Sequence, residues 1–229
     1  MKRSIVALAL IMAGFGALAA VAQDNSIAVT AAAAMGPPTS AFGLEVTMEA
    51  GAVDQAFVMA GPDKGFADEG VLKGSFFVNP QASGLAPGQY FQMLVLMQDT
   101  ALPSDVKVIF FLHRDLPGNY FCSVWHYDEG LGNYTFTNGG FFALPDNPTF
   151  NQTQIEFEWT AGDPGNLKVW RTLWIGGMPD PSGQILIFDT PVSGQATAAI
   201  NYVFAGMFNK STHPGIAGTV YLDEFEFRR

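Results

Sequence analysis

The chain has 229 residues, of which 48% are hydrophobic and 14% charged, and its formal net charge is −10 at pH 7. This excess of acidic residues disfavours a nucleic-acid-binding protein, because the neutralisation of phosphates needs a basic face. The 20 phenylalanines and 4 tryptophans exclude a wholly disordered chain, and the single cysteine, Cys122, excludes an intramolecular disulfide.

Residues 1–22 have the pattern of a secretory signal peptide. Lys2 and Arg3 precede residues 5–21, which are almost all apolar or small, and Ala20-Val21-Ala22 forms an Ala-x-Ala cleavage site. A transmembrane anchor is the alternative for this apolar run, but the small residues at its end favour cleavage. The sequence therefore predicts export to the periplasm or the exterior, with no membrane span after cleavage.

After this signal, residues 23–40 are rich in alanine and contain Pro37-Pro38, so we expect a flexible lead-in. Residues 41–229 are predicted to form a single β-sandwich domain, because short runs with strand character recur between turn residues. Several of these runs alternate between apolar and polar residues, as strands with one buried face do. The runs are 42–48, 56–60, 71–78, 90–98, 106–114, 119–127, 134–142, 154–160, 167–175, 184–188, 199–208 and 218–227.

So many strands without a helical pattern predict either two packed antiparallel sheets or a closed barrel. The strands of an outer-membrane β-barrel alternate between lipid-facing and lumen-facing residues. The run Val108-Ile109-Phe110-Phe111-Leu112 is apolar on both faces, which is typical of a sandwich core rather than a wet lumen. We therefore expect an all-β two-sheet sandwich, with an outer-membrane β-barrel as the alternative.

Segments in three parts of the chain together resemble a known pattern of strands. They are Phe42-Gly43-Leu44-Glu45-Val46 and Gly74-Ser75-Phe76-Phe77-Val78-Asn79-Pro80, then Ile155-Glu156-Phe157-Glu158-Trp159 and Leu167-Lys168-Val169-Trp170, then Gly218-Thr219-Val220-Tyr221-Leu222-Asp223-Glu224-Phe225. Over residues 42–229 the chain is similar to bacterial secreted proteins with a concanavalin A-like (laminin G-like) jelly roll. The resemblance implies two curved antiparallel sheets. Many such relatives bind sugars and some cleave them, but the matched segments carry no catalytic signature.

Glu156 and Glu158 are the candidate residues for glycoside hydrolysis on such a fold. Side chains two apart on a strand share a face, with Cβ atoms about 6.5–7 Å apart, and retaining glycosidases hold two carboxyl groups about 5–5.5 Å apart. A pair of glutamates on an amphipathic strand is more often simply solvated. The Glu-x-Asp-x-x-Glu motif of similar hydrolases is also absent from the sequence.

His113 and Arg114 precede a turn, and Tyr120 and His126 lie on the next predicted strand. A histidine, a tyrosine and an arginine on one sheet face could serve a polysaccharide lyase, in which a base removes the C5 proton of a uronate. Alternation along a regular strand, however, places His113 and Arg114 on opposite faces. The lone Cys122 is expected to be a buried small hydrophobe rather than a nucleophile.

Aromatic rings beside polar neighbours are the candidate ligand-binding residues. Trp125 and Tyr127 share a strand face with Ser123, and Trp170 shares one with Thr172. A flat apolar ring next to hydrogen-bonding groups suits a sugar. We therefore predict a secreted, non-catalytic binding or structural module, with a glycan as candidate partner. A carbohydrate-active enzyme, either a glycoside hydrolase or a polysaccharide lyase, is the alternative.

The resemblance also implies a structural Ca²⁺ held in part by an acid on the final strand, where Asp223 matches. Glu45, Glu49, Glu224 and Glu226 are further acidic residues on the first and last predicted strands. Calcium needs six to eight oxygen ligands, and the sequence has no Asp-x-Asp-x-Asp loop. No cofactor is therefore predicted, and Ca²⁺ is retained only as an expectation from the resemblance.

Overall fold

A computed structural model describes residues 26–35, 43–50, 55–61, 68–99, 103–145, 152–209 and 215–228. Within these ranges the regular elements are strands, apart from the 3-10 turns Ala31–Ala33 and Pro103–Asp105. The strands are β1 (Ser26–Thr30), β2 (Gly43–Met48), β3 (Ala56–Ala60), β4 (Val71–Ala82), β5 (Tyr90–Met97), β6 (Val106–Arg114), β7 (Tyr120–Asp128), β8 (Asn133–Leu144), β9 (Gln152–Thr160), β10 (Gly165–Ile175), β11 (Met178–Pro179), β12 (Ile185–Val192), β13 (Tyr202–Asn209) and β14 (Gly218–Arg228). The predicted signal peptide, residues 1–22, lies outside the described residues.

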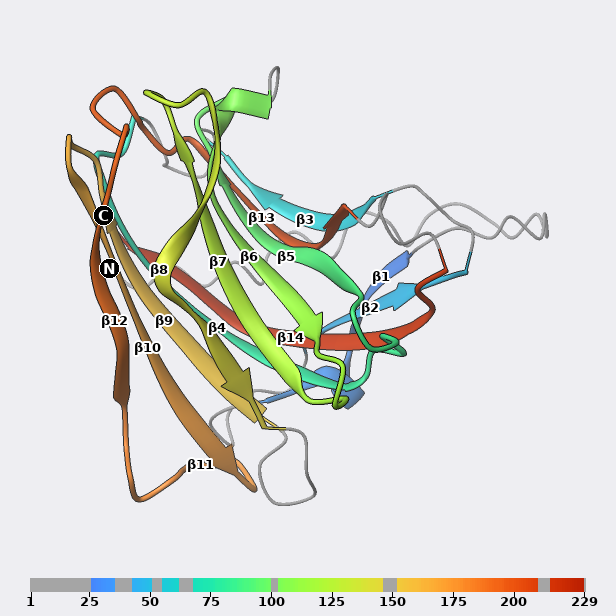
Figure 1. Cartoon of the computed structure of the whole chain (residues 1–229). Coiled ribbons are helices and arrows are strands. Elements are labelled where there is room, and N and C mark those ends of the chain that lie inside the picture. The colour runs from blue at the N-terminus through green and yellow to red at the C-terminus, as the bar shows by residue number, and fades with distance from the viewer. Residues whose placement is uncertain are drawn as a thin grey trace.

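The strands form two antiparallel sheets. Sheet A has the order β1-β2-β14-β4-β9-β10-β11, with β12 also paired to β10, and sheet B has the order β3-β13-β5-β6-β7-β8. Figure 1 shows the two sheets stacked, with the axes of β5, β6 and β7 nearly aligned with those of β4, β9 and β10. The described strands do not close into one barrel. The jelly-roll sandwich prediction is therefore confirmed, and the barrel alternative is wrong. None of the helices in the described ranges has the length and apolar character needed to cross a membrane.

Alternation along the strands builds the core between the sheets. Ile155, Phe157 and Trp159 of β9 are at most 2% exposed, and they pack with residues of sheet B such as Phe110. The apolar residues of β6 belong to two different hydrophobic clusters. Phe110 points into the core between the sheets, whereas Ile109 belongs to a second cluster on the outer face of sheet B, with Val95, Met97, Val106 and Phe204. This division explains why β6 is apolar on both faces.

Part of the segment expected to be a flexible lead-in is an ordered edge strand. β1 pairs with β2, with Ser26 opposite Thr47, and Ile27 packs against the core. The backbone N–H of Met35 then donates to the buried carboxylate of Asp223 at 2.6 Å. The sequence did not reveal this strand for two reasons. The run Ser-Ile-Ala-Val-Thr is short and lies in an alanine-rich segment, and its partner β2 comes later in the chain.

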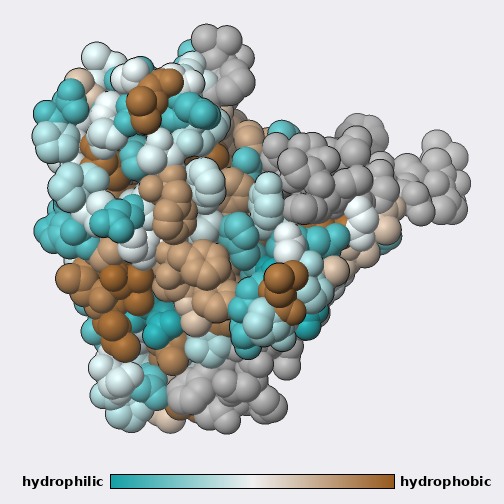
Figure 2. Space-filling view, in the orientation of Figure 1, coloured by the Kyte–Doolittle hydropathy of each residue, from teal (hydrophilic) through white to brown (hydrophobic). Residues whose placement is uncertain are grey.

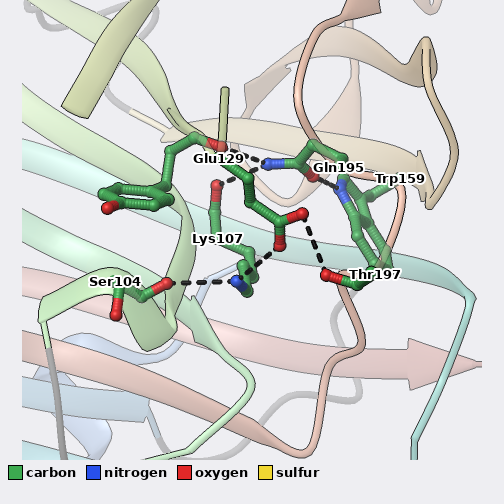
Figure 3. Close-up of polar contacts among 7 residues, drawn as sticks. Ser104, Lys107, Glu129, Trp159, Gln195 and Thr197 are labelled. Atoms are coloured by element: carbon green, nitrogen blue, oxygen red, sulfur yellow. Dashed lines mark hydrogen bonds and ion pairs between the residues drawn. The ribbon is translucent and has the colours of Figure 1, made fainter. Parts of the chain in front are cut away.

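A buried amide links the two sheets at one end of the sandwich (Figure 3). The indole Nε1 of Trp159, in sheet A, donates to Oε1 of Gln195 at 2.6 Å. The Nε2 of Gln195 donates to the backbone carbonyls of Tyr127 at 2.9 Å and Lys107 at 3.4 Å, both in sheet B. Gln195 itself is fully buried, so its amide pairs polar groups of both sheets away from water.

Beside this amide, the side chain of Lys107 forms a largely buried ion pair. Its Nζ lies 3.0 Å from Oε1 of Glu129 and donates to the carbonyl of Ser104 at 3.1 Å. The other carboxylate oxygen of Glu129 accepts from the hydroxyl of Thr197 at 3.0 Å. Figure 3 shows that these contacts join β6 and β7 to the segment that carries Gln195 and Thr197.

Replacing Gln195 by methionine should lower the free energy of unfolding by about 2 kcal/mol or more. The substitution keeps the volume but removes the acceptor of the Trp159 indole N–H and a donor to two backbone carbonyls, and a buried polar group that loses its partner costs about 1–3 kcal/mol. Urea denaturation measures the loss. Gln184→Met, at an exposed glutamine, is the matched control and should change stability little. Equal stabilities for the two variants would contradict this account of the bridge.

The buried His126 should make the fold less stable in mild acid. His126 is 4% exposed, and its Nδ1 lies 3.0 Å from the hydroxyl of Thr137. Burial lowers the pKa of His126 from its ordinary 6.5, although the charge of Asp128 opposes this shift. At mildly acidic pH the unfolded chain therefore binds a proton at His126 more readily than the folded chain does. The free energy of unfolding thus falls as pH decreases below about 6.5.

Urea denaturation of the native chain and of His126→Asn, at about pH 7.5 and about pH 5.5, checks this. The native chain should lose stability between the two pH values, and the variant should lose less. Asp128 does not confuse the comparison, because hydrogen bonding from Ser193 lowers the pKa of that carboxyl and moves its titration to more acidic pH. An unchanged pH dependence in the variant would refute the assignment to His126.

Candidate functional site

The outer face of sheet B contains a hollow of about 270 Å³, here called the sheet-B hollow. Its lining comes from β5, β6, β7 and β8: Tyr90, Gln92, Ile109, Phe111, His113, Trp125 and Tyr134. Figure 2 shows hydrophobic residues in the middle of its view, over the strands that Figure 1 labels β6 and β7. Exposed rings of β8, Phe136 and Phe141, belong to the same face. The face is therefore unusually aromatic for an outer surface.

The polar side chains of the hollow come together through strand register. Tyr90 of β5 lies directly opposite His113 of β6, and their ring centroids are 5.0 Å apart. Gln92, two residues after Tyr90, shares its face and lies opposite Phe111. A phenol, an imidazole and a carboxamide thus line one hollow.

A buried hydroxyl fixes the orientation of His113. The Nε2 of His113 lies 2.5 Å from Oγ of Ser123, on the neighbouring strand β7. The same oxygen accepts a hydrogen bond from Nε1 of Trp125 at 3.2 Å. Ser123 is only 2% exposed, so it supports both rings from beneath the surface. This support holds the imidazole and the indole in fixed positions at the hollow.

The lining of the hollow carries no Asp, Glu, Lys or Arg among the described residues. Apolar walls around few polar groups lower the local dielectric and strengthen hydrogen bonds made inside the hollow. Burial, with the neighbouring Tyr127 and Asp105, raises the pKa of Tyr134 to about 12. Tyr134 therefore stays protonated at neutral pH and can act only as a neutral hydrogen-bonding group.

The three predicted ligand-binding residues do not form one site. Trp125 lines the sheet-B hollow. Tyr127 lies further along β7, with its ring 5.3 Å from that of Tyr134 and 5.7 Å from the ammonium of Lys107. Trp170 belongs to β10 and faces outward from sheet A, on the opposite side of the sandwich.

The combination of Arg114, Tyr120 and His126 considered for a lyase is not assembled either. Arg114 points away from His113 and donates to the carbonyls of Leu85 at 2.7 Å and Gly118 at 3.0 Å. Its guanidinium lies over the ring of Tyr120, which is 4% exposed in the core. His126 is buried as well. The prediction that His113 and Arg114 occupy opposite faces is thus confirmed.

Cys122 is fully buried in the core between the sheets. Burial raises the pKa of its thiol well above the ordinary value. A thiol that stays protonated and inaccessible is not a nucleophile, which agrees with the expectation of a small buried hydrophobe.

Sequence reasoning missed Tyr90 and Gln92. Their spacing of two residues predicts a shared strand face, and this signal was present in the run 90–98. What the sequence did not provide is the register that sets Tyr90 beside His113. That register includes an irregularity between Gln92 and Leu94, which local alternation cannot predict.

Glu156 and Glu158 lie in a second hollow of about 310 Å³ on the outer face of sheet A, here called the sheet-A hollow. Its lining is Lys73, Gly74, Ser75, Glu156, Phe157, Glu158, Trp170, Gln184, Glu226 and Arg228. Glu158 forms an ion pair with Lys73 at 2.7 Å, and Glu156 accepts a hydrogen bond from Gln184. Both carboxylates are therefore engaged by neighbouring side chains.

The acids considered for calcium do not form a ligand set. Among the described residues, no three His, Cys, Asp or Glu side chains are grouped as metal ligands. The two oxygens of Asp223 accept from the backbone N–H groups of Met35 at 2.6 Å and Glu224 at 2.7 Å. The described acids thus form no cluster around Asp223, and Ca²⁺ binding stays a prediction of the resemblance alone.

No family model matches this chain, and no curated protein matches it. Solved structures do match. A marine alginate lyase from Aplysia kurodai has a TM-score of 0.55 at 12% identity, over 88% of this chain and 86% of its own. An endo-β-1,4-glucuronan lyase from the fungus Trichoderma reesei has a TM-score of 0.54 at 12% identity, over 94% and 91%. The alginate lyase Aly36B has a TM-score of 0.54 at 12% identity, over 83% and 82%.

These matches correct two expectations from the sequence. The chain was expected to be a non-catalytic binding or structural module and not an enzyme, but the similar solved structures are polysaccharide lyases. The finding favours the alternative of a carbohydrate-active enzyme. At this low identity the likeness itself shows the fold, a jelly-roll sandwich of the concanavalin A-like type.

Proposed function

We propose that this chain is a polysaccharide lyase that cleaves a uronic-acid-containing glycan by β-elimination in the sheet-B hollow. The observation that carries the proposal is the juxtaposition of Tyr90, His113 and Gln92 in one hollow of a lyase-like sandwich. The substrate class follows from the structural neighbours, which are named as alginate and glucuronan lyases.

β-Elimination needs two functions that these side chains can supply. A base removes the C5 proton of the uronate, the C4–C5 double bond forms as the C4–O4 bond breaks, and an acid protonates the departing O4. Atoms and electrons balance without water or an oxidant. The C5 proton becomes more acidic when hydrogen bonds or a positive charge neutralise the carboxylate beside it.

His113 and Tyr90 are the proton-transfer pair of this proposal. Their rings are adjacent, with centroids 5.0 Å apart, so one sugar residue can contact both. One of the pair takes the C5 proton and the other supplies the proton to O4. The carboxamide of Gln92 lines the same hollow and can donate an N–H to the uronate carboxylate.

The aromatic walls support the same reaction. Trp125 provides a flat ring for an adjacent sugar residue, and Phe111 lies between Tyr90 and Trp125, with centroid distances of 5.6 Å and 6.2 Å. The described residues of the lining include no carboxylate that would repel a uronate. The apolar rings of the lining also strengthen hydrogen bonds to developing charge, because they lower the local dielectric. Export, predicted from residues 1–22, would place the enzyme where it meets such polysaccharides.

Tyr90→Phe and His113→Ala should each reduce turnover by about 10²–10⁴-fold, the usual contribution of a general acid or base. The assay is ultraviolet absorbance of the unsaturated product from alginate and from glucuronan. Tyr221→Phe, at a tyrosine of sheet A, is the matched control and should retain full turnover. Full turnover in either test variant would contradict the proposal. A second result would also contradict it. This result is hydrolysis, seen as reducing ends released without an ultraviolet-absorbing product, and lost in Glu158→Gln.

Ser123→Ala should change the pH profile of turnover, because Ser123 positions His113 through a 2.5 Å contact. Losing this contact alters which protonation state and orientation of the imidazole are favoured. We expect a lower maximal rate and a displaced limb of the profile of kcat against pH. Thermal melting checks that the variant is folded. A uniform loss of rate with an unchanged pH profile would show that Ser123 has only a structural role.

A further inference from the structure

The outer face of sheet A presents side chains in two adjacent rows that cross its strands. The first row follows the register from β14 to β12, and its members are Arg228, Lys73, Glu158, Lys168 and Asp189. The second row runs beside it, and its members are Glu226, Ser75, Glu156, Trp170 and Leu186. All five members of the first row are charged, whereas the second row includes an aromatic ring, that of Trp170.

The charges around the sheet-A hollow are largely matched. Lys73 contacts Glu158 at 2.7 Å, and Arg228 contacts Glu226 at 2.6 Å. The lining holds the two cations Lys73 and Arg228 against three carboxylates, Glu156 being the third. Such a surface has no excess of cations to attract a polyanion, but it offers donors and acceptors at close spacing. Neutral ligands rich in hydroxyl groups suit it best.

Trp170 gives this hollow a flat apolar floor. The ring is half-buried, and its strand neighbours on this face are Glu156 on one side and Leu186, which is 50% exposed, on the other. Gln184 reaches the same place and donates to the carboxylate of Glu156. An indole with a carboxylate, a carboxamide and an aliphatic edge around it can stack on one sugar ring and bond its hydroxyls.

We propose that the sheet-A hollow is a second glycan-binding site, selective for neutral sugar residues, with Trp170 as its stacking ring. It lies on the opposite side of the sandwich from the sheet-B hollow, so one glycan residue cannot occupy both. The volume of about 310 Å³ holds one or two sugar rings. The proposal goes beyond lyase activity, because it rests on the sheet-A residues alone.

The test measures the binding of neutral oligosaccharides by isothermal titration calorimetry. The protein carries His113→Ala, so that turnover does not interfere, and the probes are cello-, xylo- and manno-oligosaccharides. Trp170→Ala in this background should weaken binding about tenfold or more through the loss of stacking. Trp170→Phe should retain part of the affinity, because a ring remains. Alginate oligosaccharide binding should not respond to either change.

Two further variants control for folding and for location. Gln184→Ala, at an exposed residue that removes only a hydrogen-bonding group, should weaken neutral-sugar binding severalfold without unfolding the chain. Phe136→Ala removes a ring that is 41% exposed on the opposite sheet, and it should leave this binding unchanged. If no neutral probe binds, or if Trp170→Ala and Gln184→Ala bind as tightly as the background, the second site does not exist. Loss of lyase turnover, measured with His113 intact, bears on the sheet-B hollow alone.

Discussion

The amide of Gln195 is the contact on which the arrangement of the two sheets depends. It joins the indole of Trp159 in sheet A to the carbonyls of Lys107 and Tyr127 in sheet B. Apolar packing between sheets is not directional and permits small slides, whereas three hydrogen bonds to one buried amide allow a single position. The two strands held in this way, β6 and β7, carry His113 and its supporting residues on their outer face. A polar bridge inside the sandwich therefore fixes the site outside it.

Alternation along β6 and β7 separates two chemically different histidines. His126 points inward, where burial lowers its pKa and a threonine hydroxyl is its described contact. His113 points outward into the hollow, and Ser123 orients it without enclosing it. One histidine is thus buried in the core, and the other lines the sheet-B hollow. The difference arises from alternation along the strands. Odd-numbered residues of β6, including His113, face outward, whereas His126 of β7 lies opposite the core residue Val108 and faces inward.

The fold was predictable from the sequence because its signal is local. Every predicted run overlaps an observed strand, and the alternation in 154–160 placed Ile155, Phe157 and Trp159 correctly in the core. The site was only partly predictable, because it depends on which sheet each strand joins. Trp125 and Trp170 have equivalent neighbours along the chain, yet long-range pairing puts them on opposite sides of the sandwich. No local pattern carries that information.

The two outer faces differ in how their polar groups are used, and this difference decides where chemistry can occur. On sheet A, the carboxylate of Glu156 contacts the amide of Gln184, and the carboxylate of Glu158 contacts the ammonium of Lys73, and these contacts hold both in place. A carboxylate engaged in this way must give up its partner before it can contact a reacting atom. On sheet B, Tyr90 and His113 both stand beside the ring of Phe111 in the lining of the hollow. The proposed proton transfer is therefore assigned to the aromatic face, and the proposed neutral-glycan site to the charged face.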